Sequence, residues 1–237
     1  MALPIQKTAT YVTTVPSTKK QVKFRPFLVK EEKALLLAQQ SDDQTVMMET
    51  LKKVLKDCVE GIDADTLATF DIEYLFSQIR AKSVGEVVDL VLRCDTCEDE
   101  KAKVKVSIDL TKLEVNIPEG HSKNIKLFDD VGIVMKYPNI ELIKTLESVD
   151  TTNDAEAIFD VIVHSIEYIY AGEELHYAHE QKKEDLHQFI ENLTQEQFRK
   201  IQKFFEEMPK LEKQVDYTCP VCNKNQSILV SGLDSFF

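Results

Sequence analysis

The sequence predicts an α+β fold made of small antiparallel β elements and amphipathic helices. Apolar residues alternate with polar ones in some segments, as in half-buried strands, and recur every three to four residues in others, as in helices. The two patterns follow one another in the order hairpin, helices, strands, helices and hairpin. Two Cys-x-x-Cys pairs stand in strand-like surroundings, one near the middle of the chain and one near its end.

The first part of the chain, residues 1–86, is predicted to be an N-terminal hairpin followed by helices. Residues 8–15 and 21–28 alternate between apolar and polar side chains on either side of a turn, which predicts a β-hairpin. From Lys30 the spacing becomes helical, and acidic residues stand where the helix begins. We expect this first helix to bury the apolar run at residues 34–37.

Two further amphipathic helices are expected before residue 86, each marked by apolar residues at three- and four-residue steps. The apolar face of the first comprises Met47, Leu51, Val54, Leu55, Cys58 and Val59. That of the second comprises Ile72, Leu75, Phe76, Ile79 and Ala81. Gly61 is the expected C-cap of the first helix, and Asp71 is the expected N-cap of the second. Cys58 is expected to be a small buried apolar residue rather than a reactive thiol.

The remainder, residues 87–237, is predicted to be a zinc-ribbon-like β region with an inserted β/α subdomain. The β region comprises residues 87–110 and 212–237, in which alternating runs flank each cysteine pair, and the insertion comprises residues 111–211. Alternation predicts strands in the insertion at residues 113–117 and 132–136. Helical spacing predicts helices at residues 140–146, 154–170 and 183–192, and a capping box predicts a further helix that follows Thr194.

The candidate site residues are Cys94, Cys97, Cys219 and Cys222, because their two pairs offer four sulfur ligands. Each pair with its flanking strands resembles half of a zinc ribbon, in which two such turns hold one tetrahedral Zn²⁺. A redox dithiol is the alternative for a single pair, but no βαβ pattern surrounds either one. About 120 residues separate the pairs, so the intervening segment must fold and bring its ends together. A site with four cysteine ligands has no open coordination position and is therefore structural.

Composition and charge disfavour several classes of protein. The formal net charge of −12, from 29 basic and 41 acidic residues, disfavours a surface that follows nucleic-acid phosphates. No stretch approaches the length of a membrane span, and residues 1–7 lack the apolar core of a secretion signal. We therefore expect a cytosolic protein, in which cysteines are more often metal ligands than disulfides. The glycine-rich motifs that bind nucleotide phosphates, Gly-x-Gly-x-x-Gly and Gly-x-x-x-x-Gly-Lys-Ser/Thr, do not occur in the sequence.

Histidine offers the best case for catalysis, and it is weak. His176, His179 and Glu180 stand close together in the sequence, but the flanking ligands of a zinc protease are missing, so a solvated polar stretch is favoured. His164 falls within a predicted apolar helix and is expected to be an interior residue rather than a general base. No nucleophile signature such as Gly-x-Ser-x-Gly occurs. The residues therefore favour a protein that is not an enzyme.

Three segments are distinctive: KFRPFLVKEEK at residues 23–33, FDIEYLFSQIRAKSVGE at residues 70–86 and LTQEQFRKIQKFFEEMPKL at residues 193–211. Together with both cysteine pairs they resemble, over nearly the whole chain, the baseplate hub assembly protein family of T4-like contractile-tailed bacteriophages. The resemblance implies a non-enzymatic viral protein that binds baseplate hub or tail proteins and helps the hub to form in the host cytoplasm. It implies no catalytic residues.

Two segments are candidate contact surfaces for such partners. Arg25 and Phe27 combine a guanidinium with an aromatic ring, residue types enriched at interface centres, although an aromatic residue on a strand more often belongs to the core. The tail at residues 231–237 ends in two phenylalanines and either enters a partner groove or folds back over its own sheet. The competing function is a zinc-ribbon regulator that binds nucleic acid or the transcription apparatus. The hub protein bound, the number of copies and a place in the mature virion stay open.

Overall fold

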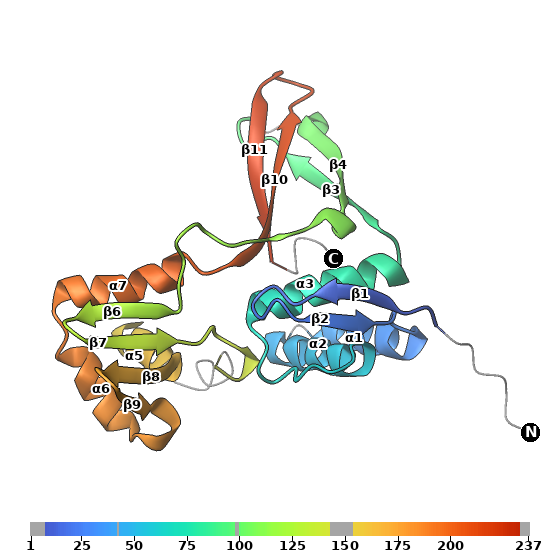
Figure 1. Cartoon of the computed structure of the whole chain (residues 1–237). Coiled ribbons are helices and arrows are strands. Elements are labelled where there is room, and N and C mark those ends of the chain that lie inside the picture. Colours follow the sequence, from blue (N-terminus) through green and yellow to red (C-terminus); the bar gives the residue numbers. More distant parts are fainter. Residues whose placement is uncertain (1–7, 42, 98–99, 143–153, 233–237) are drawn as a thin grey trace, which may run out of the picture. The chain divides into compact units, whose positions relative to one another are not determined.

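The computed structural model describes residues 8–41, 43–97, 100–142 and 154–232. It confirms a mixed α+β protein built from helices and several small antiparallel sheets (Figure 1). The chain divides into two compact units, one comprising residues 1–116 and 210–237 and the other comprising residues 117–209. No helix in the described part is both long enough and apolar enough to cross a lipid bilayer.

An antiparallel hairpin opens the first unit, as the alternating pattern predicts. Strand β1 (Tyr11–Thr14) pairs with strand β2 (Gln21–Phe24). The pairing extends beyond the hairpin, because the last residue of β2 forms a β-bridge with Val59 and the Arg25 N–H donates to the Cys58 carbonyl at 2.9 Å. The hairpin is thereby joined to the segment that follows the second helix.

Three helices follow the hairpin: α1 (Val29–Ser41), α2 (Gln44–Cys58) and α3 (Thr69–Ser83). The apolar residues predicted for α2 and α3 are buried, except for the half-buried Met47. The carboxylate of Asp43 accepts hydrogen bonds from the first N–H groups of α2, which fixes where this helix begins. Periodicity therefore identifies both helices and the faces that they bury.

Two of the expected helix caps are wrong. The C-cap of α2 is Val59, because the bridge to β2 draws this residue into extended conformation, and Gly61 follows in a turn with a φ of +70°. Asp71 lies inside the first turn of α3, which begins two residues earlier. The fully buried Asp71 carboxylate instead accepts the N–H of Ser17 at 2.9 Å, so it fastens the hairpin turn to the helix.

The buried face of α1 also differs from the expected one. Leu36 and Leu37 are 53% and 57% exposed, whereas Glu31 and Ala38 are buried. The apolar run at residues 34–37 therefore does not mark the face that meets the core. Polar contacts in the first turn of α1 decide the orientation of the helix instead.

Those polar contacts centre on the carboxylate of Glu31. It accepts hydrogen bonds from Arg25 Nη2 at 2.9 Å and from the Leu28 N–H at 2.7 Å, and it forms an ion pair with Lys30 Nζ at 3.1 Å. Burial by itself raises the pKa of this carboxyl, but the hydrogen bonds from Arg25 and Leu28 outweigh it and lower the pKa to about 2. The carboxylate of Glu31 therefore joins the residue that follows β2 to the first turn of α1.

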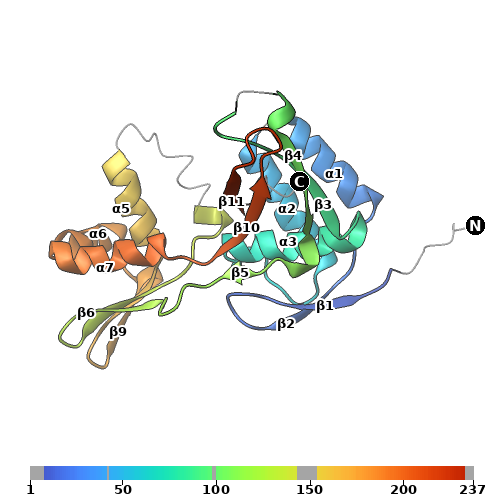
Figure 2. The same cartoon turned by 90° about the horizontal axis from the view of Figure 1, so that it is seen from above.

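Two more antiparallel hairpins complete the first unit, and they lie side by side (Figures 1 and 2). Strand β3 (Val87–Arg93) pairs with β4 (Lys103–Asp109), and β10 (Lys210–Thr218) pairs with β11 (Asn225–Ser231). The start of β10 also pairs with the short strand β5 (Val115–Asn116). The core between the hairpins comprises Ala81, Val88, Leu92, Ile108, Leu110, Leu113, Leu211, Val215, Tyr217 and Val230.

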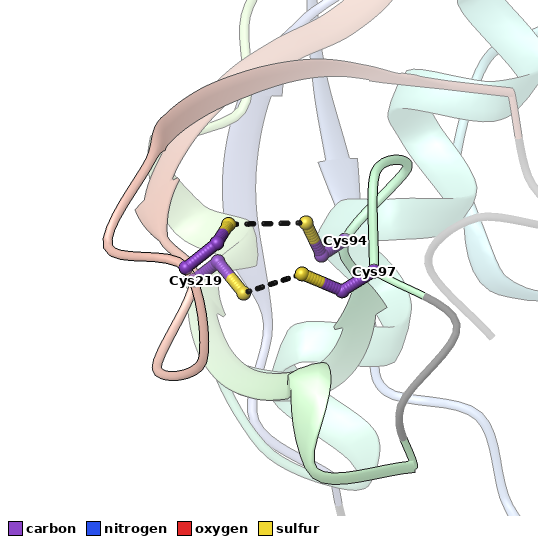
Figure 3. Close-up of side chains that lie close together, drawn as sticks. Cys94, Cys97 and Cys219 are labelled. Carbon is purple, nitrogen blue, oxygen red and sulfur yellow. Dashed lines mark hydrogen bonds between the residues drawn. The ribbon is translucent and has the colours of Figure 1, made fainter.

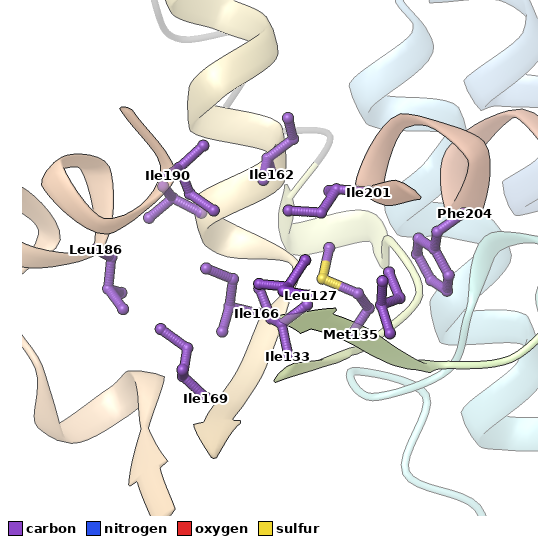
Figure 4. Packing of buried hydrophobic residues seen from close by; sticks show 12 residues of the cluster. Leu127, Ile133, Met135, Ile162, Ile166, Ile169, Leu186, Ile190, Ile201 and Phe204 are labelled. Carbon is purple, nitrogen blue, oxygen red and sulfur yellow. The ribbon is translucent and has the colours of Figure 1, made fainter. Parts of the chain in front are cut away.

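The second unit is an antiparallel sheet with helices on one face. The strands in spatial order are β6 (Asn124–Phe128), β7 (Val131–Met135), β8 (Ile166–Ala171) and β9 (Glu174–Tyr177). The helices are α5 (Asp154–His164), α6 (Lys183–Glu191) and α7 (Gln195–Glu206). Sheet and helix side chains, such as Ile133, Ile162 and Phe204, interdigitate in the core (Figure 4).

Short 3-10 helices occur in both units. Among the described residues, two belong to the first unit, at Glu100–Ala102 and Leu110–Lys112, and one belongs to the second unit, at Ala178–Glu180.

The helix predicted over residues 154–170 is wrong in its second half. Helix α5 ends at His164, and Ile166–Ala171 is a strand that pairs with β7 on one side and β9 on the other. Sheet pairing outweighs helical spacing here, because β-branched and aromatic residues fit a pleated surface well. Of the helix expected at residues 140–146, only residues 140–142 belong to the described part, and these are helical.

We expect the ion pair between the half-buried Arg25 and the buried Glu31 to make stability depend on pH. Because the pKa of Glu31 falls from 4.5 to about 2 on folding, its contribution of about 3 kcal/mol is present above pH 4.5 and is lost as the pH approaches 2. Glu31→Gln should therefore lower the free energy of unfolding by about 3 kcal/mol at pH 7, measured by urea titration. Glu32→Gln, at an exposed neighbour, is the matched control and should change little. Equal stability of the two variants would contradict this account.

Candidate metal centre

The two cysteine pairs lie in tight turns at the ends of the two hairpins of the first unit. Cys94 directly follows β3, and Cys219 directly follows β10. A backbone hydrogen bond fixes each of them: the Cys94 N–H donates to the Ala102 carbonyl at 3.1 Å, and the Cys219 N–H donates to the Lys224 carbonyl at 3.0 Å. Asn223 completes the second turn with a φ of +55°, a conformation that asparagine tolerates better than most residues.

Four sulfur atoms converge between these turns (Figure 3). All four Sγ atoms lie within 4.8 Å of one another, with Cys94 Sγ 3.8 Å from Cys222 Sγ and Cys97 Sγ 3.9 Å from Cys219 Sγ. None of the four cysteines is in a disulfide. Sulfur ligands at about 2.3 Å from a tetrahedral zinc ion lie about 3.8 Å apart. The structure therefore brings the four predicted residues together at a spacing that fits one tetrahedral cation.

Polar groups contact the sulfur atoms from within the turns. Cys94 and Cys219 are buried, and the other two cysteines are half-buried. The Thr96 hydroxyl lies 3.3 Å from Cys94 Sγ, and the Val221 N–H donates to Cys219 Sγ at 3.4 Å. Hydrogen bonds of this kind stabilise thiolate charge and orient metal ligands.

The thiols of the cluster do not share one pKa. Hydrogen bonding by Thr96 lowers the pKa of Cys94 to about 6, and a backbone hydrogen bond from Lys224 lowers the pKa of Cys222. The neighbouring Cys222 sulfur raises the pKa of Cys97 to about 12. Thiolate charges at these distances repel one another, so all four cysteines ionise together only when a cation lies among them.

A direct hydrogen bond joins the two hairpins next to the sulfur cluster. The Tyr217 hydroxyl donates to the carbonyl of Arg93, the residue that precedes Cys94, at 2.9 Å. The Tyr217 ring is buried in the core between the hairpins. One side chain of β10 thereby contributes both apolar packing and a polar link to the end of β3.

The other sequence candidates lie outside this cluster. Cys58 is buried, and burial raises the pKa of its thiol to about 11. His176 and His179 are exposed, and no third ligand gathers with them in the described part of the chain. The Nδ1 atom of the half-buried His164 lies 2.8 Å from the Asp160 carbonyl. Of the predicted C-terminal contact segment, residues 233–237 lie outside the described residues.

Comparison with known families shows what kind of protein carries this cluster. The model of the family described as T4 bacteriophage base plate protein matches residues 8–237. The chain belongs to this family. As a member of the base plate family, it is a structural phage protein that contacts other tail or base plate proteins. No curated protein and no solved structure matches the chain.

Sequence reasoning missed two contributors to the cysteine cluster of this base plate protein. Thr96 stands inside the first cysteine pair, and its hydroxyl lies within reach of two sulfurs, 3.3 Å from Cys94 and 3.9 Å from Cys222. A hydroxyl residue between two cysteines is a local signal that identifies such a contact. Tyr217 gives no comparable signal, because alternation predicts a buried ring but not the distant carbonyl that its hydroxyl meets.

We expect Tyr217→Phe to lower the free energy of unfolding by about 1 kcal/mol, because it removes the hydrogen bond to Arg93 while keeping the ring. Urea titration of the purified chain measures this change. Tyr168→Phe is the matched control, since the hydroxyl of the half-buried Tyr168 forms no hydrogen bond with another of the described residues. Equal stability of both variants would show that the link between the hairpins contributes nothing.

Proposed function

We propose that this base plate family member is a non-enzymatic assembly factor or minor component of the base plate hub. The observation that carries the proposal is the family match, which spans both units. The three segments that resemble hub assembly proteins support the hub as its place of action. Residues 23–33 join the hairpin to α1, residues 70–86 contain most of α3, and residues 193–211 contain α7. These segments form helices and connections of the fold, which fits a protein that acts by binding other proteins.

We infer that Cys94, Cys97, Cys219 and Cys222 bind one structural Zn²⁺. The spacing of their sulfurs supports a tetrahedral ion, and four thiolate donors favour zinc over magnesium or calcium. The four cysteines fill all coordination positions, so the ion activates no water and polarises no substrate. The zinc ion therefore links the turn that follows β3 to the turn that follows β10.

Zinc closes a ribbon-like region formed by residues 87–110 and 212–237 around the inserted residues 111–211, with residues 1–86 as a hairpin and helical region. The strand pairing of Val115–Asn116 with β10 supports this organisation, because it brings the two ends of the insertion together. In the unfolded chain the same segments are far apart, and their closure costs entropy that grows only slowly with length. The metal offsets part of that cost when the chain folds.

Loss of a single ligand should remove the metal. We expect Cys94→Ser and Cys222→Ser to reduce zinc from one ion per chain to near zero and to lower the thermal midpoint, because metal binding contributes folding free energy. Atomic emission measures the zinc content, and circular dichroism measures melting. Cys58→Ala is the matched control, since it removes a buried thiol outside the cluster, and it should keep the zinc. Full zinc content in both ligand variants would refute the site.

Charge distribution gives little support to the competing function of a zinc-ribbon regulator. Residues 117–209 contain 19 acidic and nine basic residues, and the rest of the chain contains 22 acidic and 20 basic ones. Neither unit offers the excess of positive charge with which proteins bind nucleic-acid phosphates. Protein partners are therefore favoured over nucleic acid and the transcription apparatus.

Affinity purification from infected cells separates the two functions. We expect a tagged chain to recover base plate hub or tail proteins, identified by mass spectrometry, and to recover them equally after nuclease treatment. A tagged unrelated protein controls for nonspecific capture. Fluorescence anisotropy with a labelled oligonucleotide should show no binding at moderate salt. Recovery of transcription proteins, or oligonucleotide binding that weakens steeply with salt, would favour the regulator instead.

A further inference from the structure

Most sheet edges in the described chain have features that oppose pairing with another chain. Strand β6 has a bulge between Lys126 and Phe128, and the Nζ atom of Lys200 donates to the carbonyls of Lys126 and Leu127 at 3.2 and 3.1 Å. Charged residues stand on β2, β3, β4 and β9. Strands β1 and β5 lack charge but are only four and two residues long.

Strand β11 differs from these edges. Its seven residues, Asn225–Ser231, form the outer edge of the sheet with β10 and β5, and they include no charged residue and no proline (Figure 1). The ladder with β10 runs without a bulge. Ile228 and Leu229 are 41% and 56% exposed. A long, regular and uncharged edge strand is the kind that pairs with a strand of another molecule.

The ladder also shows which backbone groups of β11 face outward. The Cys219 N–H bonds to the Lys224 carbonyl, and hydrogen-bonded pairs alternate along an antiparallel ladder, so Ile228 bonds to β10. The N–H and C=O groups of Ser227 and Leu229 therefore point away from β10. No hydrogen bond joins these groups to another residue of the described chain.

We propose that β11 pairs with the β11 strand of a second copy of this chain, antiparallel and across a two-fold axis at Ile228. Ile228 is the midpoint of the strand, so this axis aligns all seven residues with their counterparts. Ser227 then exchanges hydrogen bonds with Leu229 of the partner subunit, and the reverse. Ile228 meets Ile228 of the partner subunit in a pair without hydrogen bonds, where side chains approach most closely.

Charge and burial indicate that the strand that pairs with the outer edge of β11 comes from a second copy of this chain. Because β11 has no charged residue, self-pairing places no like charges opposite each other, unlike self-pairing through Lys126 on β6 or Glu174 on β9. Ile228 lies opposite the buried Val215 and therefore on the core side of the sheet, yet it is 41% exposed. The core between the hairpins is thus uncovered at this edge, and a second Ile228 covers it.

Sedimentation velocity of the full chain, from about 1 to about 100 µM, tests the proposal, and we expect a monomer–dimer equilibrium in this range. Ile228→Lys and Ile228→Asp each place like charges opposite one another and should raise the dissociation constant at least about tenfold. An equimolar mixture of the two variants should recover the dimer, because the two-fold axis sets lysine opposite aspartate.

A matched control and a second variant keep the test decisive. Val87→Lys adds the same charge on β3 at a residue that is 57% exposed, and it should leave dimerisation unchanged. Leu229→Pro removes an outward N–H and no bond to β10, so it should separate the dimer while circular dichroism shows an intact fold.

Several results would overturn the proposal. A wild-type chain that stays monomeric over the whole range contradicts it, and slow amide exchange of Ser227 and Leu229 in that monomer would show that the chain covers its own edge. Ile228→Lys, Ile228→Asp and Leu229→Pro chains that dimerise as the wild type does contradict it equally. A mixture of the Lys and Asp variants that fails to recover the dimer excludes the axis at Ile228.

Discussion

The arrangement of the two hairpins β3–β4 and β10–β11 depends on the meeting of two turns that are far apart in the chain. Cys97 and Cys219 are 122 positions apart, yet their sulfur atoms lie 3.9 Å from each other. No local signal brings these turns together, and the apolar core between the hairpins and the bond from Tyr217 to Arg93 do so jointly. In this base plate family protein, four of the five cysteines lie together where the two hairpins meet.

The ion pair between the half-buried Arg25 and the buried Glu31 changes how the segment at residues 23–33 is interpreted. An arginine beside a phenylalanine resembles an interface anchor in the sequence, but Arg25 donates to Glu31 and to the Pro26 carbonyl, so its guanidinium is engaged within the fold. The same carboxylate orients α1 and leaves Leu36 and Leu37 exposed. Two features that sequence reasoning treated separately therefore have one physical cause.

Sequence reasoning was accurate where neighbouring residues decide the structure. The N-terminal hairpin and the capping box at Thr194, with both of its reciprocal hydrogen bonds, are present. The local spacing within each Cys-x-x-Cys pair identified the four residues whose sulfur atoms meet, although the meeting itself joins distant segments. Sequence reasoning failed where distant segments decide the secondary structure. Ile166–Ala171 is a strand because β7 and β9 pair with it, and β9 escaped prediction because all four of its residues are exposed and give no alternation. Periodicity likewise identified the apolar residues of α1 but not the side that meets the core.

The pairing of β5 with β10 has a consequence for how proteins of this kind can diverge. The chain leaves the first unit at Asn116 and returns at Lys210, its partner in the ladder, and the Asn116 side chain donates to Glu212 at 2.8 Å. The point where the chain leaves the first unit and the point where it returns are therefore adjacent in one sheet, as are the two ends of a surface loop. Everything between them can be lengthened, trimmed or exchanged over generations while the remaining scaffold keeps its connections.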